Sequence, residues 1–185
     1  GDALDYALNF LEGRKANIHI LHVVQVENVD IAEPSLTSEV VPEEFKEAEL
    51  AMEAIQEFSN VFYGKKVDAQ ITVTTNVVIG GVANNIKKEA KKLNSDLIIM
   101  GTQGVKHNFV EKVVGSISSF VISNAPCPVI LVPRGYKFQS INNIIFATNL
   151  DHSDPYELWR ATELIKPHTG KIRCVHVTTD IKTLE

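Results

Sequence analysis

The sequence has only two cysteines, one tryptophan and no excess of basic residues, and these shortages exclude several classes of protein. Lys and Arg total 18 against 23 Asp and Glu, so the formal net charge is -5. Such a chain has no basic surplus to neutralise phosphates, which argues against general nucleic-acid binding. No uninterrupted apolar run approaches the roughly 20 residues that span a bilayer, so no membrane segment is predicted. The remaining composition, 44% hydrophobic over 185 residues, is that of a globular protein.

The two cysteines, Cys127 and Cys174, each lie inside an apolar, strand-like stretch. We therefore expect two buried thiols, which suit a reducing compartment, and no Cys/His spacing indicates a zinc site. The first residues, GDALDYALNF, have no basic segment leading into an apolar one, as a secretory signal would have. A cytoplasmic location is the expectation.

Helix-like and strand-like segments alternate along the chain. In residues 2–12 the apolar side chains recur at helical spacing, and residues 17–26 are rich in β-branched and aliphatic types. The same analysis predicts further helices that open at Pro42 and cover 82–93 and 116–124, and strands at 67–75, 96–100 and 128–132. This alternation is typical of an α/β protein with an open, mostly parallel sheet and helices on both faces.

The chain also contains an internal repeat. A constant shift of 154 positions superimposes the apolar residues of the first helix and strand on a later segment without a gap; it pairs Leu4 with Leu158, Ala7 with Ala161, Leu11 with Ile165, Ile18 with Ile172, His22 with His176 and Val23 with Val177. One repeat of this length indicates duplicated domains rather than a solenoid. We expect a first domain over 1–138 and the start of a second over 139–185.

The repeat predicts that the first domain lacks a strand. In the second copy, a strand at 142–150 precedes the helix, and its counterpart would lie before residue 1. We expect roughly a dozen residues to be missing there and about 100 after Glu185, given the usual size of such domains. Alternatively, residues 142–177 supply the strand, within one chain or across a dimer. An empty central position would expose two rows of unpaired backbone groups.

Glycines follow one predicted strand and precede the next helix. Met100 ends a strand, Gly101 and Gly104 follow, and Gly115 and Ser116 stand where the helix begins. In parallel α/β sheets, ligands bind outside the carboxyl ends of the strands, and free N–H groups at a helix start attract anions. We predict a phosphate site in which Ser116 caps a helix whose inner face holds Ile117, Phe120 and Val121. The alternative is a tight turn and a capped helix with no ligand.

The run SDLIIMGTQG...GS...SNAPCPVILVP resembles the C-terminal half of a universal stress protein domain, and ILHVV, CVHV and NIIFATNLDHSD resemble its first half. The resemblance covers essentially the whole chain, as a tandem-domain member whose second domain is truncated. It implies a Rossmann-like (flavodoxin-like) sheet of strand order 3-2-1-4-5 and a homodimer.

The resemblance also implies that the chain binds ATP, with Mg²⁺. Gly101, Gly104, Gly115 and Ser116 would contact the ribose and phosphates, and Val23 and Met100 would lie near the nucleoside. The family motif is G-x2-G-x9-G-[ST], whereas ten residues separate the second and third glycines here. The acidic residue that follows the family's first strand is replaced in the second copy by Asn149, which is neutral.

Other polar residues give weaker signals. His19, His22 and His176 are expected to be satisfied strand histidines, and Lys106 and His107 to lie in a solvated loop. No nucleophile elbow or paired aspartates follow a strand, so no catalytic residue is predicted. The sequence thus predicts a nucleotide-responsive regulatory module of the stress response, with adenine nucleotide and a second copy as partners. The alternatives are a dimerisation module that binds no nucleotide, and an enzyme that hydrolyses ATP slowly.

Overall fold

The structure is a computed structural model that describes residues 2–25, 46–47, 49–54, 57, 70–102, 115–166, 168 and 170–177. By their contacts, the residues form two compact units, Gly1–Phe138 (unit 1) and Gln139–Glu185 (unit 2). None of the helices in the described part of the chain is long and apolar enough to cross a lipid bilayer.

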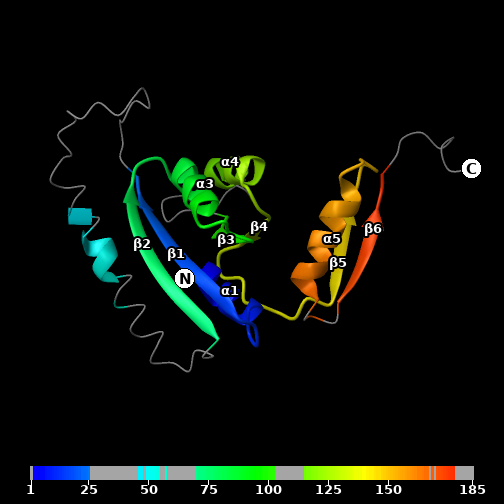
Figure 1. Cartoon of the computed structure of the whole chain (residues 1–185), viewed down its shortest axis with the longest axis horizontal. Coiled ribbons are helices and arrows are strands. Elements are labelled where there is room, and N and C mark those ends of the chain that lie inside the picture. The colour runs from blue at the N-terminus through cyan, green and yellow to red at the C-terminus, as the bar shows by residue number, and fades with distance from the viewer. Residues whose placement is uncertain are drawn as a thin grey trace, which may run out of the picture. The chain divides into compact units, whose positions relative to one another are not determined.

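Unit 1 alternates helices and strands, as the sequence predicts. Its described elements are α1 (Asp2–Phe10), β1 (Ala16–Val24), β2 (Ile71–Ile79), α3 (Val82–Lys92), β3 (Ile98–Gly101), α4 (Ser116–Asn124) and β4 (Val129–Val132) (Figure 1). Gly13, with φ +74°, follows α1 at the position expected for a helix stop. The helix predicted to open at Pro42 lies largely outside the described residues, although residues 46–47, 49–54 and 57 are helical. The α/β class is confirmed.

The described strands of unit 1 form two separate parallel pairs. β1 pairs with β2 from Ala16↔Ile71 to Val24↔Ile79, and β3 pairs with β4. The predicted order 3-2-1-4-5 would need one more strand between β1 and β3, and in the described residues no ladder joins these two strands. β2 runs to Ile79 rather than ending at 75, because the apolar residues continue until Gly80, whose φ of +130° ends the strand.

Helices hold the two strand pairs of unit 1 together. α1 packs on β3 and β4, while α3 contacts both β1 and α4. The largest fully buried side chains are Phe10, Val121 and Val132, contributed by α1, α4 and β4. Phe10 also makes ring contacts with Tyr6 and Phe138. The core therefore lies between the helices and the short β3–β4 pair, and Val24, Ile71 and Val73 extend it onto the β1–β2 pair.

Two expectations about buried side chains are wrong. On α4 the buried residues are Ser118 and Val121, whereas Ile117 and Phe120 are 36% and 44% exposed. The helix is therefore rotated so that a hydroxyl, rather than its bulkiest residues, faces the strands. Cys127 is buried as expected, but Cys174 is exposed, because in the described residues β6 pairs only with β5 and one helix covers this pair.

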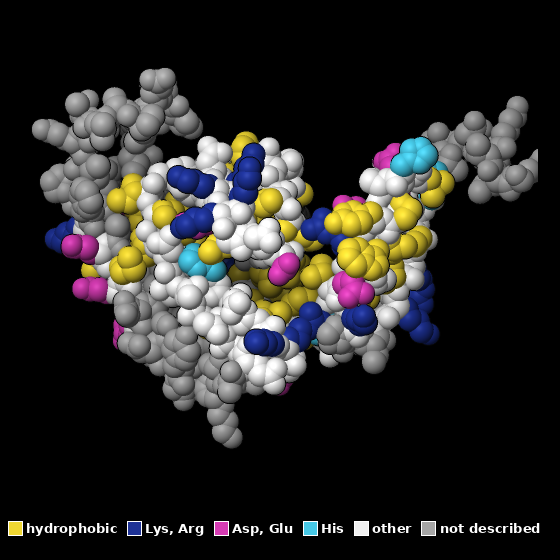
Figure 2. Space-filling view, viewed as in Figure 1, with side chains coloured by type: hydrophobic (Ala, Val, Ile, Leu, Met, Phe, Trp, Pro, Cys, Tyr) yellow, Lys and Arg dark blue, Asp and Glu magenta, His cyan; other side chains and the backbone are white. Residues whose placement is uncertain are grey.

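The lysines of α3 form the solvated face that the sequence predicts. Lys87, Lys88, Lys91 and Lys92 are all exposed, and basic side chains gather over this helix in the space-filling view (Figure 2). Lys92 forms an ion pair with Glu89 on its own helix.

The described part of unit 2 folds as one strand–helix–strand unit. It contains β5 (Asn143–Ala147), α5 (Asp154–Ile165) and β6 (Lys171–Val175), and its two strands pair in parallel. Much apolar surface remains uncovered: Ile145 is 72% exposed and Val177 85%. A parallel strand pair under one helix cannot bury both faces of its sheet.

Candidate functional site

The carboxyl end of β3 and the start of α4 are joined by a backbone hydrogen bond. The Gly115 N–H donates to the Thr102 carbonyl oxygen over 3.3 Å. Gly115 and Ser116 therefore lie beside Gly101 and Thr102, although twelve residues (103–114) separate them in sequence. The glycines on either side of that segment meet at the tip of β3. Gly104 and the predicted loop residues Lys106 and His107 lie outside the described residues.

A buried hydroxyl that the sequence interpretation missed reinforces this junction. Ser118 is 3% exposed, and its Oγ lies 3.4 Å from the carbonyl oxygen of Gly101 and 3.2 Å from that of Thr102. Thr102 is itself buried, at 7% exposure. The sequence contains one indication that Ser118 is buried: it lies three positions before Val121, and residues at that spacing share one face of a helix.

The start of α4 differs from the expectation in one respect. The N-cap residue is Gly115, with no side-chain cap, and Ser116 is the first helical residue with an exposed side chain. Ser116 is therefore not the cap. A helix without a capping side chain leaves its first N–H groups open at the positive end of the dipole, and this first turn carries no acidic residue. Both features suit a phosphate group.

The start of α5 in unit 2 has the opposite character. Asp154 and Glu157 stand in its first turn, and the Asp154 carboxylate accepts hydrogen bonds from the Asp151 N–H at 2.9 Å and from the Thr148 hydroxyl. The first turn of α5 therefore carries negative charge, although this helix start, like that of α4, has no side-chain cap. Asn149 lies in the same turn, exposed to solvent, directly before Leu150 with its φ of +63°.

The predicted nucleoside contacts lie on separate sheets. Val23 is half-buried near the end of β1, and Met100 is half-buried near the end of β3. Because the described residues form no ladder between β1 and β3, the structure does not bring these two side chains together through strand pairing. Among the predicted site residues of unit 1, the structure brings Gly101, Gly115 and Ser116 together at the β3–α4 junction.

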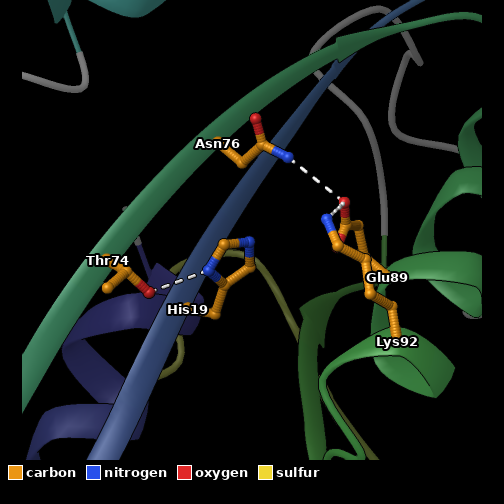
Figure 3. Close-up of polar contacts among 5 residues, drawn as sticks. All are labelled: His19, Thr74, Asn76, Glu89 and Lys92. Carbon is orange, nitrogen blue, oxygen red and sulfur yellow. Dashed lines mark hydrogen bonds and ion pairs between the residues drawn. The ribbon is translucent and has the colours of Figure 1, made fainter.

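A second polar group, which the sequence interpretation missed, lies where α3 covers the β1–β2 pair (Figure 3). His19 Nδ1 and Thr74 Oγ1 are 2.8 Å apart across the two strands. Close by, Glu89 Oε1 accepts hydrogen bonds from Asn76 Nδ2 at 3.2 Å and from Lys92 Nζ at 3.0 Å. His19 Nε2 and Glu89 Oε2 are buried without a hydrogen-bond partner.

Electrostatics in this group favour the ionised carboxylate. The hydrogen bond from Lys92 is the main cause that lowers the pKa of Glu89, and the charge of Lys92, with smaller contributions from His19 and Asn76, acts in the same direction against the opposing effect of desolvation. In the described part of the chain, no three His, Cys, Asp or Glu side chains come together as metal ligands. We interpret this group as structural.

The repeated histidines differ in their surroundings. In unit 2, His176 Nδ1 lies 2.9 Å from the carbonyl oxygen of Thr148, at the end of β5. His22, its counterpart in the repeat, is exposed on β1, and no hydrogen bond from its ring to another described residue is found. The expectation of a satisfied strand histidine is therefore met for His176.

Comparison with known proteins agrees with the fold. The sequence model of the universal stress protein family matches residues 1–133. The chain belongs to the universal stress protein family. A universal stress protein of Methanocaldococcus jannaschii is 32% identical over 140 residues, which is 74% of this chain and 76% of that protein.

Solved structures of universal stress proteins extend the agreement. The structure of UspA from Lactobacillus plantarum matches with a TM-score of 0.58 and 26% identity, over 70% of this chain and 86% of that one. A universal stress protein from Archaeoglobus fulgidus matches with a TM-score of 0.67 over 97% of this chain and 62% of that one. At 19% identity the second match shows the fold alone, but its alignment reaches into unit 2.

Proposed function

We propose that this universal stress protein is a cytoplasmic regulatory module of the stress response that binds ATP at the β3–α4 junction. The observation that supports the proposal is the hydrogen bond from Gly115 to Thr102, which places an uncapped helix start against the tip of a parallel strand. Phosphates bind there to the first N–H groups of α4, and Gly101 allows close approach because it has no side chain. Gly104, Ser116, Met100 and Val23 complete the proposed contacts.

In this proposal, Mg²⁺ binds as part of the Mg²⁺–ATP complex. The described residues offer no carboxylate cluster for the ion, and Mg²⁺ is commonly held by phosphates and water with few protein ligands. ATP binding then stabilises the junction and changes the contacts that the protein makes with its homodimer partner.

A second candidate function is a dimerisation module that binds no nucleotide. Two sequence features favour it: the ten-residue spacing before Gly115, where the family motif has nine, and the neutral Asn149 in place of an acid. Neither feature removes the helix start at Ser116, so we place ATP binding first.

Two measurements test the proposal. Denaturation of the freshly purified protein, followed by mass spectrometry of the released small molecules, should yield adenine nucleotide in a fixed ratio to the chain. Calorimetric titration of nucleotide-free protein with ATP and Mg²⁺ should show saturable heat, and titration with adenosine should show much less because the phosphates are absent. If ATP and adenosine give equal, unsaturable signals, the dimerisation module is the better description.

A further inference from the structure

The side of α3 that faces away from the buried Ala90 carries only basic charge. Four lysines on this side are all exposed: Lys87, Lys88, Lys91 and Lys92. We call these four lysines the basic face. In the part of the chain that the structure describes, Lys92 is the one member that forms an ion pair, with Glu89. Three unpaired positive charges therefore meet the solvent within little more than one helical turn.

The basic face belongs to a chain that is acidic elsewhere. Residues 82–93 contain four lysines and one glutamate, which leaves 14 basic and 22 acidic side chains in the rest of the sequence. The positive charge is thus concentrated on one helix. Such a distribution orients the protein, because an anionic partner attracts α3 while it repels most of the remaining surface.

Exposed apolar side chains adjoin the basic face. α4 packs against α3, and on α4 the side chain of Phe120 is 44% exposed. Phe120 lies on the side of its helix that faces away from the buried Ser118 and Val121, so it projects outward as the lysines do. Leu93, at the C-cap of α3, is also 44% exposed. Basic and hydrophobic side chains accordingly lie next to one another over α3 and α4 (Figure 2).

The residue types of this surface indicate the chemistry of its partner. Its basic residues are all lysines, whose ammonium groups are mobile point charges, whereas arginine forks bind a single phosphate or carboxylate in fixed geometry. Lysine is also depleted at protein–protein interfaces, where arginine, tyrosine and tryptophan are enriched. An anionic lipid surface presents diffuse negative charge to ammonium groups and an apolar layer to leucine and phenylalanine.

We propose that unit 1 docks on the surface of an anionic membrane through the basic face, with Phe120 and Leu93 inserted among the lipid headgroups. Attraction to anionic lipids contributes about fivefold in affinity for each lysine near the surface. Lys92 contributes less than the other three, because Glu89 shares its charge. α3 keeps its contacts with β1 and α4 on docking, since only its outward side is used.

The test measures binding of the full chain to lipid vesicles by co-sedimentation. Vesicles of phosphatidylglycerol and phosphatidylcholine in equal parts should bind the protein at least tenfold more tightly than vesicles of phosphatidylcholine alone. Lys87→Gln/Lys91→Gln should weaken binding to the mixed vesicles about 25-fold, at roughly fivefold for each charge removed. The matched control is Lys15→Gln/Lys137→Gln, which removes two exposed charges of unit 1 outside α3 and α4 and should weaken binding less than about threefold.

A second pair of variants tests the apolar contact. Phe120→Ala should weaken binding to the mixed vesicles about fivefold, because a partly exposed ring loses its burial among the lipids. Tyr136→Ala is its matched control: Tyr136 is an aromatic residue of unit 1 that is 45% exposed but lies outside α3 and α4, so this variant should bind as wild type does. Added salt should release wild type from the mixed vesicles, since it screens the lysine charges.

Each other outcome overturns the inference. Wild type that does not bind the mixed vesicles, or binds both kinds equally, has no anionic-lipid surface. Equal losses in the two lysine pairs mean that total charge, rather than α3, governs the attraction. Phe120→Ala that binds as wild type does means that no side chain of α4 enters the lipid, and tighter binding to a short DNA duplex than to the mixed vesicles assigns the basic face to nucleic acid. ATP titration of the same samples is read separately, because the basic face takes no part in the proposed nucleotide site.

Discussion

The Gly115 N–H lies 3.3 Å from the Thr102 carbonyl oxygen, and this hydrogen bond fixes the position of α4 against β3. A Cβ atom at residue 115 would stand 3.3 Å from the same oxygen, closer than most real contacts. The junction therefore needs glycine for space rather than for an unusual backbone, since its φ is -72°. Any side chain here must push the helix start away from the strand tip.

Gly115→Val should accordingly weaken ATP binding at least tenfold and destabilise the fold by about 1–3 kcal/mol, the usual cost of overpacking. Calorimetry with ATP and a denaturant melt measure the two effects. Gly81→Val is a matched control: Gly81 is also an N-cap glycine, with φ -67°, but no atom lies within 4 Å of the added Cβ. Equal ATP affinity of the two variants would show that the junction does not hold the phosphates.

Ser118 should contribute to stability through its buried hydroxyl. Ser118→Ala removes the donor to the Gly101 and Thr102 carbonyl oxygens and should cost about 1–2 kcal/mol in the free energy of unfolding. Ser123→Ala on the exposed side of α4, where the hydroxyl bonds to Ser119 O four residues earlier, should change it by less than about 0.5 kcal/mol. Urea melts at neutral pH measure both. If the variants are equally stable, the hydroxyl of Ser118 does not secure the junction.

The sequence predicted the class of fold because its apolar patterning is local and regular. The stripe in α1 and the short apolar runs of β3 and β4 each specify one element without knowledge of the rest. The buried face of α4 was mispredicted because hydrophobicity favours burial of Phe120. In the structure Ser118 is buried instead, since its hydroxyl donates to a carbonyl oxygen at the end of β3. That competition depends on tertiary contacts.

The candidate site divides in the same way. The glycines of the β3–α4 junction can be predicted from their place after a strand and before a helix. The hydrogen bond between Gly115 and Thr102 could not be predicted, because it depends on how the chain returns to the end of β3. The group around Glu89 could not be predicted, because it requires both the strand register that sets His19 beside Thr74 and the placement of α3. Residues distant in sequence meet there.

Glu89 should make the stability of unit 1 depend on pH. Its pKa is lower in the folded chain than in the unfolded one, chiefly because of the Lys92 hydrogen bond, so its contribution is present above the unfolded pKa of about 4.3 and is lost as the pH falls through the folded value. Glu89→Gln should cost about 1 kcal/mol at pH 7 and flatten the acid limb of the stability curve. Denaturant melts from pH 7 to pH 3 provide the comparison.

The matched control for Glu89 is Glu163. It pairs with Lys166 over 3.5 Å, but both side chains are largely exposed, so Glu163→Gln should change stability by less than about 0.5 kcal/mol at any pH. An acid limb that is equally steep in wild type and Glu89→Gln would mean that other carboxylates govern the loss of stability.

Phe10 should be the side chain of α1 on which unit 1 depends most. It is 2% exposed, lies 6.4 Å from the ring centre of Phe138, and carries the Arg14 guanidinium over its ring at 5.0 Å. Phe10→Ala should lower the free energy of unfolding by about 3–5 kcal/mol, because a buried aromatic side chain leaves a cavity that its neighbours fill only in part. Phe120→Ala removes the same ring from a site that is 44% exposed and should cost about 1 kcal/mol or less. Thermal and urea melts of both variants measure the contrast, and two similar losses would show that α1 is not packed into the core as described.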